Sequence, residues 1–144
     1  MNIHASAIAL GALGVLIEGP SGSGKTSLAL AAIEKLQSQN HFAALVADDQ
    51  CLIEIAHGRL IARCPPALTG QAEMRGLGVV KVNNLTSAVI DCVIRLAEPP
   101  KIERMPDQQL TVIAGIQLPV FELPARQIAV SVSIFTQIVK DRRF

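Results

Sequence analysis

The apolar positions of the first half of the chain form short runs that predict alternating strands and helices. Residues 3–10 read as a strand, 11–14 as a turn and 15–17 as a short buried strand. Between Lys25 and Gln37, apolar residues recur at helical spacing with alanines between them, which predicts a helix. The run 43–47 predicts another buried strand, and 52–55 with 60–62 predicts a hairpin.

The second half is less regular. Residues 65–78 are rich in Pro and Gly, which predicts a surface loop or a loop with a helix. Residues 79–82 and 88–96 read as strands, and three prolines between 99 and 106 predict a long loop. Apolar residues from 128 to 139 follow helical spacing; positions 130–134 also alternate as in a strand, and we favour the helix. The pattern as a whole predicts an α/β fold with an antiparallel contribution.

Size and composition bound the class of protein. The chain has 144 residues, 50% of them hydrophobic and 17% charged, which suits a single domain over residues 1–144 with buried strands or subunit contacts. Phe135 and Ile138 are candidates for such a contact, although core burial is the commoner fate of such residues. No run reaches the roughly 18 apolar residues of a membrane span. The apolar segment 1–17 leads directly into the motif described next, which argues against a signal peptide.

Charge and cysteine usage add two exclusions. The net charge is +1, without a basic run, and the chain has no Trp and no Tyr, so we expect no nucleic-acid partner. Cys51, Cys64 and Cys92 show no metal-like spacing and are expected to be reduced thiols of a cytoplasmic protein.

The segment GPSGSGKT matches the phosphate-loop pattern G-x-x-x-x-G-K-[ST] at every fixed position and lies between a predicted strand and a predicted helix. Its backbone amides and the helix N-terminus would bind nucleotide phosphates. Lys25 would reach the β- and γ-phosphates, and Thr26 would bind Mg²⁺. The predicted nucleotide-binding residues are Gly19, Pro20, Ser21, Gly22, Ser23, Gly24, Lys25 and Thr26.

Asp48 and Asp49 end the next apolar strand, which we expect beside the loop strand in a βαβ unit. One carboxylate at this place is the usual partner of Mg²⁺, and a second can take a proton from an attacking hydroxyl. Because neighbouring residues on a strand face opposite ways, only one is expected to face the phosphate directly. A third segment, QAEMRGLGVV, places Glu73 and Arg75 close together before two glycines.

Taken together, these segments resemble the catalytic domain of the HPr kinase/phosphorylase family. HASAIAL resembles the family's His-bearing strand, LIEGPSGSGKTSLAL its phosphate loop, and LVADDQ its strand with paired aspartates. EMRGLGVVKV resembles the family signature E-I-R-G-L-G-I. The resemblance covers nearly the whole chain, and it implies a short form without the family's N-terminal domain.

The resemblance implies a phosphate-loop kinase domain of the HPr kinase/PEP carboxykinase-like type, with a mixed sheet and flanking helices. It implies ATP and Mg²⁺ as cofactors, an HPr-like phosphocarrier protein of the phosphotransferase system as partner, and a hexamer. It assigns Asp49 as the proton acceptor, and His4, Lys25 and Arg104 as further catalytic residues. The metal ligands would be Thr26 and Glu73, with Asp48 beside them. Arg104 rests on the short segment Glu103-Arg104-Met105, which is similar to the family's D-R-L.

One departure concerns the reverse reaction, removal of the phosphate by inorganic phosphate. The family shows P-G-R-N where this chain has Pro124-Ala125-Arg126-Gln127. Alanine lacks the access of glycine to positive φ, so the sequence leaves the reverse activity open. Two other functions also stay open: a small-molecule kinase, against which the lack of an arginine-rich lid argues, and a nucleotide sensor without catalysis.

Overall fold

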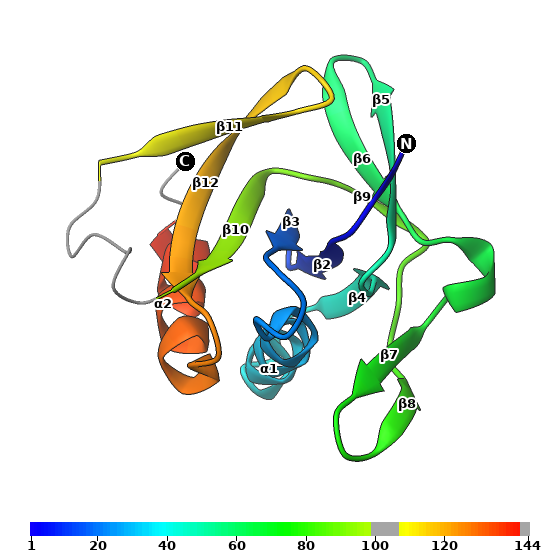
Figure 1. Ribbon diagram of the computed structural model, residues 1–144, viewed down its shortest axis with the longest axis vertical. Helices are drawn as coiled ribbons and strands as arrows, with labels where there is room; N and C mark the ends of the chain where they lie inside the picture. Colours follow the sequence, from blue (N-terminus) through cyan, green and yellow to red (C-terminus); the bar gives the residue numbers. More distant parts are fainter. Residues whose placement is uncertain (99–106, 142–144) are drawn as a thin grey trace.

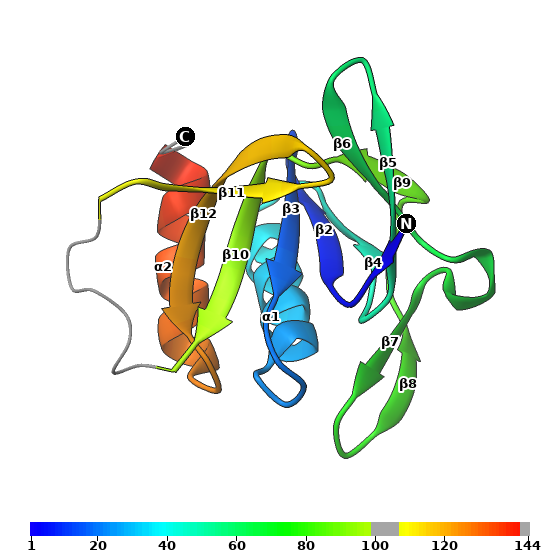
Figure 2. The same ribbon diagram turned by 45° about the horizontal axis from the view of Figure 1, so that its top comes forward.

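The computed structural model describes residues 1–98 and 107–141 (Figures 1 and 2). It contains two α-helices, α1 (Lys25–Ser38) and α2 (Ile128–Asp141), and a 3₁₀ helix, η1 (Pro66–Leu68). Its strands are β1 (Asn2–Ile3), β2 (Ser6–Leu10), β3 (Leu13–Glu18), β4 (Ala43–Ala47), β5 (Cys51–Ala56), β6 (Arg59–Arg63), β7 (Gln71–Met74), β8 (Gly78–Lys81), β9 (Ser87–Val89), β10 (Cys92–Ala97), β11 (Gln109–Ile113) and β12 (Ile116–Pro124).

The central element is a six-stranded mixed sheet in the order β11-β12-β10-β3-β2-β4. Strand β10 runs parallel to both β3 and β12, whereas β2 is antiparallel to its neighbours β3 and β4. A four-stranded sheet, β1-β5-β6-β9, and the hairpin β7-β8 complete the strands. The predicted α/β class with an antiparallel contribution is confirmed.

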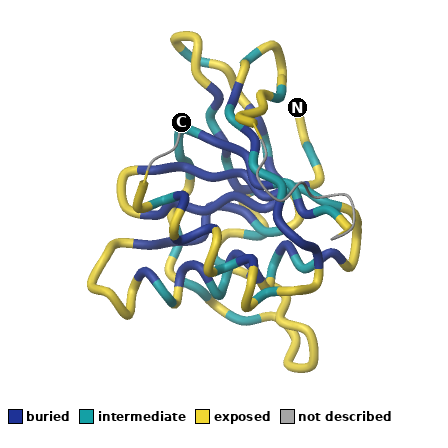
Figure 3. The backbone as a smooth tube through the Cα atoms, turned by 90° about the vertical axis from the view of Figure 1, so that its left-hand side faces the viewer, coloured by how far each residue is buried: buried dark blue, intermediate teal, exposed yellow. Residues whose placement is uncertain are grey.

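The elements stack in three layers around two apolar cores. Helices α1 and α2 lie side by side on one face of the six-stranded sheet (Figures 1 and 2), and residues such as Leu28, Ile94 and Phe135 fill the core between them. Residues such as Leu16, Leu60 and Val93 form the second core, which joins the two sheets. Figure 3 shows the buried residues gathered in the interior and the exposed ones on the outer loops.

Helix α1 closely matches its prediction, because its local signals agree. Its buried side chains, among them Leu28, Ile33 and Leu36, form one stripe against the sheet. The helix ends at a left-handed Asn40, φ 61°, whose amide donates to the Gln37 carbonyl while the His41 amide donates to the Leu36 carbonyl. This is a Schellman termination with Asn in the position that glycine usually takes.

Helix α2 was expected to begin near residue 128, and the structure confirms the helix over the alternative strand. Its residues Phe135 and Ile138, which are 0% and 6% exposed, lie in the chain's own core. They are therefore not available as a subunit contact, and the candidate contact is wrong for these two positions.

Two strand predictions are wrong in extent because the chain changes sheet within them. The segment 88–96 is divided between β9 and β10, since the Asp91 amide donates to the Gly14 carbonyl and redirects the chain from one sheet to the other. Gly14 itself lies within β3, so the predicted turn is confined to Gly11 and Ala12. The strand expected over residues 3–10 is interrupted at His4 and Ala5.

Two hairpins were not predicted. The segment expected as a loop, 65–78, contains β7, which pairs with β8 and brings Ala72 into the core; left-handed Gly76 and Gly78 lie at its turn. Strands β11 and β12 join through Ala114 and Gly115, which have positive φ of 49° and 81°. The predicted loop around Pro99, Pro100 and Pro106 lies outside the described residues.

No helix in the described ranges has both the length and the apolar character needed to cross a bilayer. Cys51, Cys64 and Cys92 are free and buried, and burial raises the pKa of the Cys51 thiol to about 11 and that of Cys92 to about 12.

Candidate functional site: a phosphate loop beside two aspartates

The loop from Gly19 to Gly24 connects β3 to α1 at the carboxyl end of the parallel strands (Figure 2). Gly22 and Gly24 have φ of 78° and 99°, which side chains rarely permit. Gly19 is required for a different reason, because a Cβ there would lie 2.7 Å from Ser23 Oγ and 3.1 Å from Leu96 Cβ. The loop therefore needs glycine at each position that the motif fixes.

Lys25 is the first residue of α1 and is only 6% exposed. Its Nζ donates to the carbonyls of Gly19 and Pro20, at 3.0 and 3.3 Å, so the ammonium group lies against the loop. A buried cation, a helix N-terminus and left-handed glycines within one loop form an anion site. These residues fit the phosphates of a nucleotide.

Thr26 and Asp48 meet across the sheet edge. Thr26 Oγ1 donates to Asp48 Oδ1 at 2.7 Å, and the other carboxylate oxygen accepts the Glu73 amide at 3.2 Å. Because the Thr26 proton points to the carboxylate, the hydroxyl lone pairs remain available to a cation. The described residues contain no cluster of three His, Cys, Asp or Glu side chains that could hold a metal ion alone. This sparse oxygen set fits Mg²⁺, which usually takes few protein ligands together with phosphate oxygens and water.

Asp49 is separated from this contact although it is the next residue. Its φ of 65° is left-handed, and its Oδ1 lies 3.0 Å from His4 Nε2. The two side chains are 53% (His4) and 54% (Asp49) exposed, so an incoming hydroxyl group can reach the carboxylate. The two aspartates thus have different surroundings, one beside the loop threonine and one beside the histidine.

The strand that bears the aspartates was wrongly placed by the sequence. Strand β4 does not pair with the loop strand β3, because β2 lies between them and pairs with both. This insertion explains why His4, two residues before β2, is next to Asp49. It also brings Ser6, which sequence reasoning did not select, between the aspartates and the loop strand.

The predicted site residues thus fall into three groups. Two contacts bring four of them together at one edge of the sheet: Thr26 bonds to Asp48, and the neighbouring Asp49 lies beside His4. Lys25 directly precedes Thr26 and bonds to carbonyls of the phosphate loop. Glu73 joins them through its backbone amide, on the hairpin that projects beside this edge (Figure 2). Arg104 lies outside the described residues.

The segment before α2 closes over the phosphate loop. The Arg126 amide donates to the Ser23 carbonyl at 2.9 Å, and the Arg126 guanidinium pairs with Glu98. Arg126, not Ala125, has the positive φ, 59°. The expectation that position 125 needs the positive φ of a glycine is therefore wrong for this chain. Ala125 is buried, and its backbone is not left-handed.

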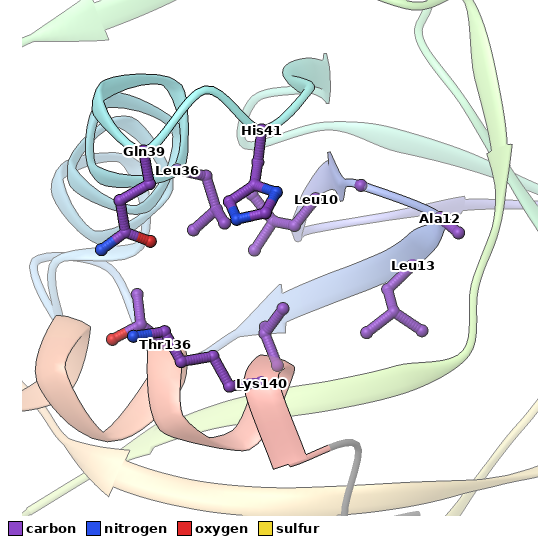
Figure 4. Close-up of a pocket in the computed structure, with 10 residues that line it drawn as sticks. Leu10, Ala12, Leu13, Leu36, Gln39, His41, Thr136 and Lys140 are labelled. Atoms are coloured by element: carbon purple, nitrogen blue, oxygen red, sulfur yellow. The ribbon is translucent and has the colours of Figure 1, made fainter.

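A pocket lies at the opposite end of α1 from the phosphate loop (Figure 4). This pocket of about 300 Å³ is lined by apolar residues such as Leu10, Leu13 and Leu36, together with His41 and Lys140. Leu36 is near the last turn of α1, whereas the phosphate loop precedes its first turn. The pocket is therefore separate from the residues assembled above.

Comparison with known proteins agrees with this geometry. The family model described as "HPr Serine kinase C-terminal domain" matches residues 1–143. The chain is 39% identical over 110 residues to an HPr kinase/phosphorylase of Bordetella petrii, covering 69% of this chain and 34% of that protein. It is 31% identical over 134 residues to an HPr kinase/phosphorylase of Malacoplasma penetrans, covering 85% of this chain and 42% of that protein. The chain thus spans well under half the length of these curated relatives.

A solved structure, the Hpr(Ser) kinase/phosphatase from Coxiella burnetii, superposes with a TM-score of 0.84. The match covers 99% of this chain and 90% of that chain at 24% sequence identity, which shows a shared fold.

Proposed function

The chain belongs to the family of HPr serine kinase C-terminal domains, and on that premise we propose that it transfers the γ-phosphoryl group of ATP to a serine of an HPr-like phosphocarrier protein. The observation that carries this proposal is the separation of the two aspartates. Asp48 contacts the loop threonine, whereas Asp49 is exposed beside His4 and outside that contact. One carboxylate is therefore suited to the metal side of the site and the other to an incoming hydroxyl.

The phosphate loop would hold the triphosphate. Residues Gly19 to Thr26 present backbone amides and the α1 N-terminus to the phosphates, and the Lys25 ammonium would leave the loop carbonyls to contact the β- and γ-phosphates. Thr26, Asp48 and Glu73 would hold Mg²⁺, which would neutralise charge on the phosphate oxygens.

Asp49 would act as the proton acceptor. As the serine oxygen forms its bond to the γ-phosphorus, the bond from that phosphorus to the bridging oxygen breaks and ADP leaves. The serine proton passes to the Asp49 carboxylate. His4 keeps that carboxylate oriented through the contact at 3.0 Å, and the half-exposed position lets a protein hydroxyl approach.

We include the reverse reaction, attack of inorganic phosphate on the phosphoserine, in the proposal. In that direction Asp49 would return the proton to the leaving serine oxygen. The sequence left this reaction open because alanine at position 125 disfavours positive φ. That reason does not apply, because the left-handed residue of the segment is Arg126.

We further propose that residues 1–144 work as one catalytic domain in a cytoplasmic homo-oligomer, with a hexamer expected from the family resemblance. In support, Val130 and Ile134 on α2 and Leu110 and Val112 on β11 are between 41% and 60% exposed. Light scattering measures the mass of the assembly directly.

Mass spectrometry of an HPr protein after incubation with ATP, Mg²⁺ and this chain tests the main proposal. We expect one phosphoserine, and its loss on return to excess inorganic phosphate. Asp49→Asn should lower the transfer rate by about 10²–10⁴-fold while nucleotide affinity is retained. Asn is preferable to Ala because it tolerates the left-handed φ. Phosphorylation of a metabolite panel instead of HPr, or tight ATP binding without any transfer, would refute the proposal.

A further inference from the structure

Ser6 is a fully buried hydroxyl at the edge of the candidate site. It is 0% exposed and is the first residue of β2, in a stretch that is otherwise apolar. The β2-β4 register shifts between Ala7 and Ile8, and beyond this irregularity Ala7 pairs with Ala47. Continuing this register by one residue places Ser6 beside Asp48.

The Ser6 hydroxyl contacts both aspartates, and the direction of each hydrogen bond is fixed by chemistry. It donates to Asp48 Oδ1 at 3.1 Å, because an ionised carboxylate only accepts. It accepts from the Asp49 amide at 3.2 Å, because an amide only donates. One hydroxyl therefore joins the side chain of the first aspartate to the backbone of the second.

These two contacts hold the Asp48 carboxylate in place and hold the backbone turn at Asp49, the two features in which the aspartates differ. The Asp48 oxygen that accepts from Ser6 also accepts from Thr26 at 2.7 Å, so Ser6 holds that oxygen in a fixed place on the loop side. The Asp49 amide is held at the residue with φ 65°, where the chain turns so that the Asp49 carboxylate meets His4. Among the described residues, no other hydrogen bond holds that amide.

We propose that Ser6 is a positioning residue that divides the aspartate pair, keeping Asp48 on Thr26 and Asp49 on His4. The functional part of this proposal rests on the proposed function, since it assumes that Asp49 accepts the serine proton. Its structural part, the bond from the Asp49 amide to the hydroxyl, is measurable without any substrate.

The substitution Ser6→Ala removes the hydroxyl with little change in volume, between two residues that are already alanine. Ser6→Cys retains a group of similar size that donates and accepts weakly. Thr136→Val is the matched control, because the Thr136 hydroxyl is also buried but, within the described part of the chain, bonds only to carbonyls of its own helix, beside the distant pocket.

Amide hydrogen exchange followed by NMR tests the structural part. A hydrogen bond of ordinary strength corresponds to up to about tenfold in an opening equilibrium. We therefore expect exchange at the Asp49 amide to accelerate by about tenfold in Ser6→Ala, less in Ser6→Cys, and not at all in Thr136→Val. The Leu45 amide, which donates to the Asn83 carbonyl, is the internal reference and should not change. Equal Asp49 exchange in the wild type and Ser6→Ala would overturn the proposal.

Single-turnover transfer to HPr, measured with MgATP affinity, tests the functional part. We expect Ser6→Ala to lower the transfer rate by about 10–100-fold, the range for a lost bond to a charged group, with ATP affinity within about threefold and Thr136→Val near the wild type. In an Asp49→Asn background, Ser6→Ala should cost clearly less than in the wild type, because the part of its effect that acts through the Asp49 carboxylate is already lost and only the part through Asp48 remains.

A full additional loss in the Asp49→Asn background, or a matching loss of ATP affinity, would mean general damage and would overturn the positioning role. A wild-type chain that transfers nothing to HPr would refute the proposed function instead. The Asp49 exchange measurement would still decide the structural part.

Discussion

Gly14 of β3 lies against the backbone of Val89, the last residue of β9, and we predict that Gly14→Ala is severely destabilising. A Cβ built at this position would lie 1.8 Å from the Val89 carbonyl oxygen and 2.8 Å from its carbon. The neighbouring atoms are backbone and cannot rotate away as a side chain would. Gly14 is also bonded to Asp91 twice, through its amide to the carboxylate at 2.8 Å and through its carbonyl to the amide at 2.7 Å.

The cost follows from these contacts. To reach the 3.4 Å of an ordinary Cβ contact, the β9-β10 connection must move away by about 1.6 Å, which breaks or weakens both bonds to Asp91. Overpacking costs about 1–3 kcal/mol, and the two bonds, one of them to a carboxylate, contribute about 2–4 kcal/mol. We expect the free energy of unfolding to fall by about 3–7 kcal/mol, a large part of the 5–15 kcal/mol typical of a domain.

Urea unfolding followed by circular dichroism measures this loss, since the chain has no Trp or Tyr for fluorescence. Gly11→Ala is the matched control: Gly11 has φ 61°, but no atom of the described residues lies within 4 Å of the added Cβ. It should lose only about 1 kcal/mol, the cost of left-handed backbone. If the two variants differ by less than 1 kcal/mol, the argument from the clash is refuted.

Three further predictions concern the thiols and the site. Because the pKa values of Cys51 and Cys92 are raised from 9.0 to about 11 and 12, the unfolded chain loses these protons first as the pH rises. The free energy of unfolding should fall by about 1.3 kcal/mol per thiol from pH 8 to 10, and urea titrations of Cys92→Ala should show a smaller fall. Asp49→Ala should be about 1 kcal/mol less stable than Asp49→Asn because of its φ of 65°; equal melting curves would contradict this. Lys25→Ala should weaken ATP binding by about 10–100-fold through loss of charged hydrogen bonds, as calorimetry would show, whereas an unchanged affinity would remove Lys25 from the phosphate site.

The sequence predicted those parts of the fold whose signals are local. Helix α1 has an apolar stripe, a glycine before it and an Asn at its end, and strand β4 is one continuous apolar run with the predicted bounds 43–47. The hairpin β5-β6 likewise has two apolar runs around a His57-Gly58 turn. In each case neighbouring residues alone favour the observed structure.

The rest depends on contacts between residues far apart in the chain. No local pattern places β2 between β3 and β4, or breaks the run 88–96 where Asp91 meets Gly14. The hairpin β11-β12 was detectable, since two apolar runs flank Ala114-Gly115. Ser6 was not, because a single serine in an apolar strand gives no signal until Asp48 and Asp49 are placed beside it.

The hydrogen bond from the Arg126 amide to the Ser23 carbonyl has a consequence for how the protein is made. The phosphate loop is synthesised before Arg126 and the α2 residue Ile128, which follow about a hundred residues later. The Ile128 Cδ1 would lie 3.0 Å from a Cβ on Gly24. Chains emerge from the ribosome N-terminus first, and contacts of such long separation form late. A nascent chain that stops before α2 should therefore lack a fully supported nucleotide site, so that nucleotide binding during translation would report that α2 has been made and packed.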